Sequence, residues 1–535
     1  MKAKITSSSR FNKSPVAKIQ PIPSSVPAPI GELLDMREVI AMLRTTRPTF
    51  YRWLRAGKLK GTKIGRQWRF RREDVERFLK GQEPQIDLVA DITPLLDTLR
   101  KRLKGNGVGE EESHESELVR AVKLIIRLAA QMRATDLHIE PQPKGVATLR
   151  YRLDGVLQPI AELDMRLLPA IVKQWKTLAA CNVHETSRPQ EGRIRMKSST
   201  AGEELDVRVT FLPAVLGEAL SAVLLDPRAA RISLEQMDYA EADKKRIQHW
   251  LGSPWGTVVF TGPTGCGKTS ALYACLNQIT AGPVRPKVMT VEDPVEYLLP
   301  GTTQVPIRAE SGMNFGSVLR AVLRSNPDVI MVGEIRDLET LTLSLQAALT
   351  GHRVLISLHT SEAVTALQRM IDAGANPFTV ADATRLIIAQ RLVRLLCSKC
   401  SVARKPAEPF LTLAQKLARL GGLPWDALPK DFREPVGCKE CNLIGFQGRT
   451  VIAEALEVTP RVAAALTRGA TIMDLRAIAV SEGMTTLACD GIRRAAQGRT
   501  SLAEVMKTVS TIYSAELSEV ASGGQQSRSA KGGQM

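Results

Sequence analysis

The sequence has no long hydrophobic run. None of its apolar stretches approaches the roughly 18 uninterrupted residues that a membrane-spanning helix needs. The first residues, MKAKITSSSRFNKSPVAKIQPIPSS, are basic and polar without an apolar core, unlike a secretory signal peptide. An internal repeat of fixed period is also missing, so the chain is not a repeat array. The lack of a membrane-spanning run and of a signal peptide predicts a cytoplasmic protein whose contact with a membrane would be peripheral.

Charge and cysteine usage narrow the choice of partners. The formal net charge is +18 and the sequence pI is near 9.7. Such a surplus favours an acidic partner, either nucleic acid or anionic lipid, although solvated helix faces explain it equally well. Of eight cysteines, four form two CxxC pairs. This spacing fits a reducing compartment and a bound metal better than a disulfide framework.

Composition and apolar periodicity divide the 535 residues into several parts. The predicted organisation is a disordered tail at 1–30, a small basic module at 31–81, a linker with one possible short helix at 82–112, an α+β domain at 113–234, a parallel-sheet α/β domain at 235–396, a cysteine-bearing segment at 397–445, a mostly helical region at 446–515 and a disordered tail at 516–535.

The stretch GPTGCGKT contains the pattern GxxxxGK[ST] between a predicted strand at 257–260 and an Ala- and Leu-rich helix. Glycines in this setting let backbone N–H groups and the helix N-terminus surround a phosphate. Lys268 would add a positive charge at the β- and γ-phosphates, and Thr269 a hydroxyl to Mg²⁺. The predicted nucleotide-binding residues are Gly262, Pro263, Thr264, Gly265, Cys266, Gly267, Lys268, Thr269 and Ser270.

Three further blocks place polar side chains at the ends of predicted strands. Glu334 ends the apolar run in DVIMVGEIRD, Glu292 lies in KVMTVEDPVEY, and His359 follows the strand in GHRVLISLHT. A carboxylate at such a strand end can polarise a water or hold Mg²⁺ through water. Each block alone is compatible with a solvated loop. Together with the phosphate loop, their order is consistent with the strand ends of one sheet.

These blocks resemble those of the type II secretion and type IV pilus assembly ATPases, in the same order and at similar spacing. The resemblance implies a RecA-like P-loop ATPase core that hydrolyses ATP with Mg²⁺ to power pseudopilus or pilus assembly. It implies Glu334 as the catalytic glutamate and magnesium ligand beside Thr269, with Lys268, Glu292 and His359 also in the catalytic site. It further implies a homohexamer that works with platform and docking proteins of the inner membrane.

The region ahead of this core resembles the family's second N-terminal domain in ATDLHIEPQPKGVATLRYRLDGVL and PQEGRIRM. That domain closes over the nucleotide and contributes arginines. Arg208 matches one of them, and FGSVLRAVLRSNPD carries over Arg320 and Arg324 as phosphate-sensing or intersubunit arginines. The resemblance leads us to expect a second arginine in this domain, but Val223 occupies that position. The loss of charge puts the family's usual closing contact in doubt.

Cys397, Cys400, Cys438 and Cys441 supply four thiolates in two close pairs. Such a ligand set suits a tetrahedral structural Zn²⁺, while metal-free turns or one redox pair remain alternatives. The resemblance agrees, because many relatives carry a tetracysteine subdomain followed by a segment such as GFQGR.

The basic module at 31–81 resembles the excisionase and MerR-type winged helix-turn-helix. Asp35 is predicted to cap its first helix, a second helix spans about 47–56, and a closing helix directs Val75, Phe78 and Leu79 inward. The fold class is thus a multi-domain α/β protein, with the winged helix and an α+β domain ahead of the ATPase core and a tetracysteine zinc subdomain after it.

Residues 31–80 hold fourteen Lys and Arg against six Asp and Glu. The resemblance implies that the second helix enters a DNA groove and that the wing contacts phosphates. The candidate contacts are Thr49, Tyr51, Arg52, Arg55, Lys63, Arg66 and Arg69. This leaves a rival hypothesis, a DNA-binding regulator or DNA-handling ATPase built on the same core, beside a role of the module in docking to protein or acidic lipid.

Overall fold

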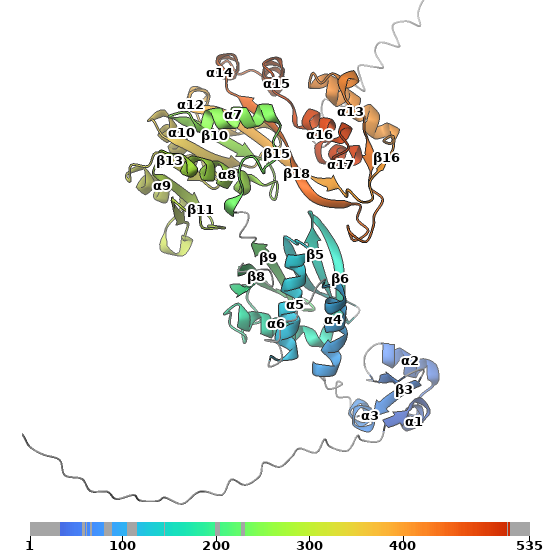
Figure 1. Cartoon of the computed structure of the whole chain (residues 1–535). Helices are drawn as coiled ribbons and strands as arrows, with labels where there is room; N and C mark the ends of the chain where they lie inside the picture. Colours follow the sequence, from blue (N-terminus) through green and yellow to red (C-terminus); the bar gives the residue numbers. More distant parts are fainter. Residues whose placement is uncertain are drawn as a thin grey trace, which may run out of the picture.

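A computed structural model describes residues 33–55, 59, 61–64, 67–79, 88–103, 115–143, 145–197, 204–225, 230–510 and 512–513. The tails predicted at 1–30 and 516–535 lie outside these residues. In Figure 1 the chain runs from a small blue module through a teal domain to a larger green-to-red body.

The N-terminal module is a three-stranded sheet with three short helices. Its elements are β1 (Leu33–Asp35), α1 (Met36–Met42), α2 (Arg47–Arg55), β2 (Thr62–Ile64), β3 (Gln67–Arg71) and α3 (Arg72–Leu79), with the sheet order β1-β3-β2. Asp35 caps α1, as predicted, in a reciprocal capping box with Glu38. Val39, Phe50, Phe70 and Val75 form the buried core. The inward position predicted for Leu79 is wrong, because its side chain is 56% exposed at the end of α3.

The second domain is a six-stranded antiparallel sheet with order β6-β5-β4-β9-β8-β7. Its elements are α4 (Leu88–Arg102), α5 (Glu117–Gln131), β4 (Asp136–Gln142), β5 (Val146–Leu153), β6 (Val156–Asp164), α6 (Leu168–Leu178), β7 (Gln190–Lys197), β8 (Glu204–Ala214) and β9 (Gly217–Leu225). The sequence placed a possible short helix in the linker at 82–112. The structure has the 15-residue α4 there, and its Ile92, Leu96 and Leu99 are buried in the core of this domain.

A seven-stranded sheet with order β12-β11-β13-β14-β10-β15-β18 forms the centre of the third domain. Its elements up to β15 are α7 (Glu241–Leu251), β10 (Gly256–Thr261), α8 (Lys268–Ala281), β11 (Val288–Glu292), β12 (Thr302–Pro306), α9 (Phe315–Leu323), β13 (Val329–Val332), α10 (Leu338–Leu349), β14 (Arg353–Leu358), α11 (Ala363–Asp372), α12 (Pro377–Ala383) and β15 (Thr384–Leu396). The strands pair in parallel except for β15 with β18. One hydrophobic core joins α9 to α12 to the sheet and another joins α7 and α8, so helices cover both faces.

The C-terminal part completes this sheet and adds the cysteine segment. Its elements are β16 (Val402–Ala403), α13 (Glu408–Leu420), β17 (Arg433–Glu434), β18 (Phe446–Glu457), α14 (Pro460–Thr467), α15 (Ile472–Ser481), α16 (Leu487–Ala496) and α17 (Leu502–Val509). The mostly helical region predicted at 446–515 therefore begins with a strand, which pairs antiparallel with β15 at the edge of the sheet.

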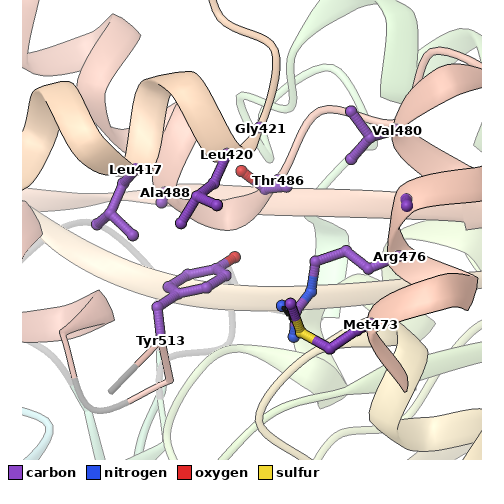
Figure 2. A pocket seen from close by; sticks show the side chains of 10 residues that line it. Leu417, Leu420, Gly421, Met473, Arg476, Val480, Thr486, Ala488 and Tyr513 are labelled. Carbon is purple, nitrogen blue, oxygen red and sulfur yellow. Dashed lines mark hydrogen bonds between the residues drawn. The ribbon is translucent and has the colours of Figure 1, made fainter. Parts of the chain in front are cut away.

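A pocket lies among α13, α15 and α16 in this C-terminal part, and Figure 2 shows Tyr513 and Arg476 on its wall. The guanidinium of Arg476 donates to both carboxylate oxygens of Glu362, at 2.7 and 2.8 Å. Leucine, valine and methionine side chains form much of the remaining lining. None of the residues that line the pocket belongs to the phosphate loop, so the pocket is not part of the candidate site.

Candidate functional site

The predicted site residues gather at one edge of the central sheet. In the order β11-β13-β14-β10, four parallel strands lie side by side. Parallel strands end at the same edge, so the segments after each carboxyl end meet there. The phosphate loop follows β10 (Figure 1). By residue number, Glu334 follows β13 and His359 follows β14.

The phosphate loop links β10 to α8 in a glycine-dependent conformation. Gly265 and Gly267 have φ values of 77° and 90°, a region that side-chain-bearing residues avoid. A Cβ atom at Gly262 would lie 2.5 Å from the Cys266 sulfur, so this position also requires glycine. Pro263 to Gly265 are exposed, whereas Cys266 is buried. The loop is thus open on its outer side and packed against the sheet on its inner side.

The side chain of Lys268 folds back onto the start of the phosphate loop. Its Nζ donates to the carbonyls of Gly262 and Pro263, at 2.8 and 3.2 Å. Burial lowers the pKa of Lys268, while the negative charge of Glu334 acts in the opposite direction. Thr269 is half-buried in the first turn of α8. The ammonium group and the helix N-terminus together give this end of the sheet the positive character that a phosphate requires.

His359 joins the lysine to the acidic side of the site. Its Nδ1 lies 3.5 Å from the Nζ of Lys268, and its Nε2 lies 3.5 Å from Oε2 of Glu334. Arg336 also pairs with Glu334 and donates to Asp293 at 3.0 Å. Lys268, His359 and Glu334, which come from three separate sequence blocks, therefore form one continuous polar cluster.

Glu292 lies deeper than the other predicted catalytic residues. Its side chain is 3% exposed, and it accepts hydrogen bonds from Tyr273 and Thr290 at 2.5 Å and from Gln304 at 3.0 Å. Tyr273 belongs to α8, the helix that begins at Lys268. The structure thus holds Glu292 in a buried hydrogen-bond network that connects the end of β11 with the phosphate-loop helix.

The predicted arginines lie on α9, at its C-terminal end and on β8 of the second domain. Arg320 is exposed and pairs with Glu339, and Arg324 is exposed at the end of α9. Burial raises the pKa of Glu296, which follows β11, and the charge of Arg208 from the second domain opposes this rise. Val223 lies opposite Arg208 on the neighbouring strand and is 46% exposed.

The sequence analysis missed two residues of β15 that hold the site loops. Gln390 donates to the carbonyl of Cys266 at 2.9 Å, and Arg391 donates to the carbonyl of Ser361 at 2.6 Å. Both side chains are buried. The only sequence signal was a Gln-Arg pair inside the apolar run LIIAQRLVRLL, because buried polar residues need partners.

The four cysteines of the two CxxC pairs converge, with all four sulfur atoms within 4.8 Å of one another. Three of the separations are 3.9, 3.8 and 3.7 Å. Sulfurs around a tetrahedral zinc with Zn–S of about 2.3 Å lie about 3.8 Å apart, so the arrangement fits this ion. Burial acts to raise the pKa of Cys441, but hydrogen bonds from the backbone N–H groups of Cys438 and Gly445 help to lower it to about 7.

The structure describes three of the predicted DNA contacts of the N-terminal module. Tyr51 on α2 is 37% exposed, Thr49 is partly exposed, and Arg69 on β3 donates to Gln67 at 2.8 Å. Arg66 and the side chains of Arg52, Arg55 and Lys63 lie outside the described residues.

Comparisons with known proteins agree with this architecture. Residues 111–507 match the family of type II/IV secretion system proteins, and residues 33–83 match a helix-turn-helix domain family. The chain is 34% identical over 437 residues to the type IV pilus assembly ATPase PilB of Myxococcus xanthus, which covers 81% of this chain and 75% of that protein. It is 37% identical over 422 residues to the type II secretion system protein HxcR of Pseudomonas aeruginosa, covering 79% and 81%.

A solved structure shares the fold. The X-ray structure of the Legionella pneumophila ATPase DotB aligns with a TM-score of 0.54 at 19% identity, covering 73% of this chain and 95% of that chain.

Proposed function

Because the chain belongs to the type II/IV secretion system protein family and is an ATP-hydrolysing enzyme of that family, we propose that ATP hydrolysis powers assembly of a type II secretion pseudopilus or a type IV pilus. The observation that carries this proposal is the cluster of Lys268, His359 and Glu334 at one edge of a parallel sheet. The relatives with 34% and 37% identity are a pilus assembly ATPase and a type II secretion protein.

In this proposal the phosphate loop binds the triphosphate of ATP. The backbone N–H groups of residues 264–270 face the phosphates, and Lys268 leaves its carbonyl partners to contact the β- and γ-phosphates. This exchange is inexpensive because the ammonium group trades two neutral acceptors for charged oxygens.

The acidic side of the site activates the attacking water. Glu334 accepts a hydrogen bond from that water and orients it toward the γ-phosphate, while His359 contacts the γ-phosphate from the other side. The hydroxyl of Thr269 and the carboxylate of Glu334 are oxygen donors of the kind that Mg²⁺ prefers, and they would hold it directly or through water. Bound there, the ion would neutralise phosphate charge.

The remaining site residues act at the edges. Glu292 orders the segment after β11 through its buried hydrogen bonds, and Arg208 approaches the nucleotide when the second domain closes. Arg320 and Arg324 are exposed and available to a neighbouring copy in a ring, which we propose is a hexamer. The tetracysteine cluster would hold a structural Zn²⁺.

The location follows from the proposed task. We propose a cytoplasmic protein at the inner membrane, bound to platform and docking proteins of the assembly machine. None of the helices in the described part of the chain combines the length and apolar character needed to cross a bilayer.

The helix-turn-helix match at residues 33–83 favours a second candidate function, a DNA-binding regulator or DNA-handling ATPase. An electrophoretic shift assay with a salt titration separates the two. Specific binding that disappears in the Arg52→Ala, Arg55→Ala double variant supports DNA recognition. Without any shift at low salt, the module is left with protein or acidic lipid as its partner.

The proposed activity is tested by phosphate release from ATP with and without Mg²⁺. The purified chain is expected to release phosphate only with the metal present. A chain that neither binds nor hydrolyses ATP under any assembly condition would contradict the proposal.

A further inference from the structure

Two consecutive hydrogen bonds connect Tyr239, through Gln390 of β15, to the backbone of the phosphate loop. Gln390 lies in β15 with no exposed surface, and its Nε2 donates to the carbonyl of Cys266 at 2.9 Å. Tyr239, which is 6% exposed, donates from its hydroxyl to Oε1 of the same glutamine at 2.5 Å. This hydrogen-bond chain therefore runs from Tyr239 through Gln390 to the loop backbone.

The chemistry of the three groups fixes the direction of each hydrogen bond. A backbone carbonyl can only accept, so the amide NH₂ of Gln390 must face Cys266. The amide oxygen then faces Tyr239, which must donate. Burial raises the pKa of Tyr239 well above its usual value, so the hydroxyl keeps its proton. The glutamine has one favourable orientation, which makes it a rigid contact.

Holding the Cys266 carbonyl also sets the next amide group. In a planar trans peptide the C=O and N–H bonds point in opposite directions. With the Cys266 carbonyl turned toward Gln390, the N–H of Gly267 points away from β15. Gly267 has a φ of 90° and precedes Lys268, so its peptide would rotate readily without an anchor. The contact therefore selects one direction for an N–H group of the phosphate loop.

The phosphate loop packs closely against Gln390 at two of its glycines. A Cβ atom at Gly267 would lie 3.3 Å from the Nε2 of Gln390, and one at Gly262 would lie 2.7 Å from the Gln390 carbonyl. Residues at both ends of the loop thus pack against this single position of β15. Among the described residues, no hydrogen bond or ion pair joins Gln390 or Tyr239 to the Lys268–His359–Glu334 cluster.

We propose that Gln390 is a positioning residue for nucleotide binding, oriented by the Tyr239 hydroxyl, and that it presents the Gly267 N–H to the phosphates. This role rests on the proposed ATPase function. It predicts that loss of the amide donor weakens nucleotide affinity, whereas the chemical step changes less because Glu334 and His359 keep their places.

Two replacements of Gln390 test the role. Gln390→Met keeps the length of the side chain and removes both polar atoms. Gln390→Glu keeps an acceptor for Tyr239 and removes the donor to Cys266. Both are expected to raise the Kd for Mg-ADP, measured by calorimetry, and the KM for ATP by about tenfold, with a smaller effect on kcat. Tyr239→Phe is expected to have a weaker effect in the same direction.

A matched control and a double variant separate positioning from general destabilisation. Thr384→Val removes a buried hydroxyl elsewhere on β15 that has no hydrogen-bond partner among the described residues. It should leave nucleotide affinity unchanged. Combining Tyr239→Phe with Gln390→Met should cost no more affinity than Gln390→Met alone, since both act through one contact.

The outcomes distinguish this role from the function on which it rests. Wild-type Mg-ADP affinity in Gln390→Glu and Gln390→Met would overturn the role of Gln390 while leaving the ATPase proposal intact. Equal losses in Thr384→Val would overturn it as well, by showing a general effect of β15. A wild-type chain that binds no nucleotide would overturn both the proposed function and this role.

Discussion

The Nζ of Lys268 lies 3.5 Å from the Nδ1 of His359, although 91 positions separate the two residues in the chain. The lysine begins α8 and the histidine follows β14, and the parallel pairing of β10 with β14 brings them together. The contact places the ammonium group of Lys268 beside His359, whose other ring nitrogen lies near Glu334.

Lys268→Ala is expected to abolish ATP binding and turnover. The ammonium group of Lys268 follows the loop glycines, and the substitution removes the charge that we propose contacts the β- and γ-phosphates. The measurement is the affinity for a fluorescent ATP analogue, together with phosphate release. Lys287→Ala, which removes an exposed lysine near β11, is the matched control and should bind as the wild type. Retained binding in Lys268→Ala would contradict the site assignment.

Zinc is expected in the purified chain at about one ion per molecule. Cys400→Ser should lose the metal, because a tetrahedral thiolate site tolerates poorly the loss of one sulfur. The melting temperature should fall, as it should after chelation of the wild-type protein. Cys181→Ser, which alters a cysteine outside the cluster, serves as control. Metal analysis that finds no zinc in the wild type, or equal zinc in Cys400→Ser, would count against this site.

Asp243 predicts a pH dependence of stability. It is 1% exposed on α7, and burial together with the neighbouring Asp490 raises its pKa to about 7, with Arg246 acting in the opposite direction. A folded-state pKa above the unfolded value means that the associated stability is present at low pH and is lost as pH rises toward 7.

Asp243→Asn, which stays neutral, should therefore be more stable than the wild type at pH 8, by roughly 1–4 kcal/mol. The difference should shrink as pH falls toward 4. Urea unfolding at several pH values measures it, and a difference that is independent of pH would refute the assignment.

Val223→Arg is expected to add a second cation to the contact that we propose between the second domain and the nucleotide. The position is exposed and lies between Arg208 on β8 and Asp136 on β4. Asp136, which already pairs with Arg152, is the nearest strand partner of opposite charge for a new guanidinium. The kcat/KM for ATP should rise several-fold, while Val223→Gln, similar in size and uncharged, should not change it. An unchanged value in both variants would show that this face does not reach the nucleotide.

Much of the site could be predicted because its signals are local. The glycines before Lys268 and the apolar runs before Glu334 and His359 each define a strand end within ten residues. Parallel pairing then leaves few ways to arrange them. The close pairs of cysteines were equally local, and the structure brings all four together.

The contacts that were missed join distant parts of the chain. Tyr239 and Gln390 are 151 positions apart, and no periodicity in either segment links them. The packing of α4 was missed for the same reason. Its apolar residues contact the core of the second domain, which is built from later parts of the chain. Leu79 was predicted inward from helical spacing alone, but α3 ends at this residue and leaves it in solvent.

Phosphate release by Glu334→Gln tests the central claim most directly. The substitution keeps the size and a hydrogen-bond acceptor of Glu334 but removes its charge, so the water that attacks the γ-phosphate is no longer polarised. The variant should bind Mg-ATP with affinity close to that of the wild type and release phosphate at least a hundredfold more slowly. Wild-type turnover in Glu334→Gln would show that hydrolysis does not take place at this edge of the sheet.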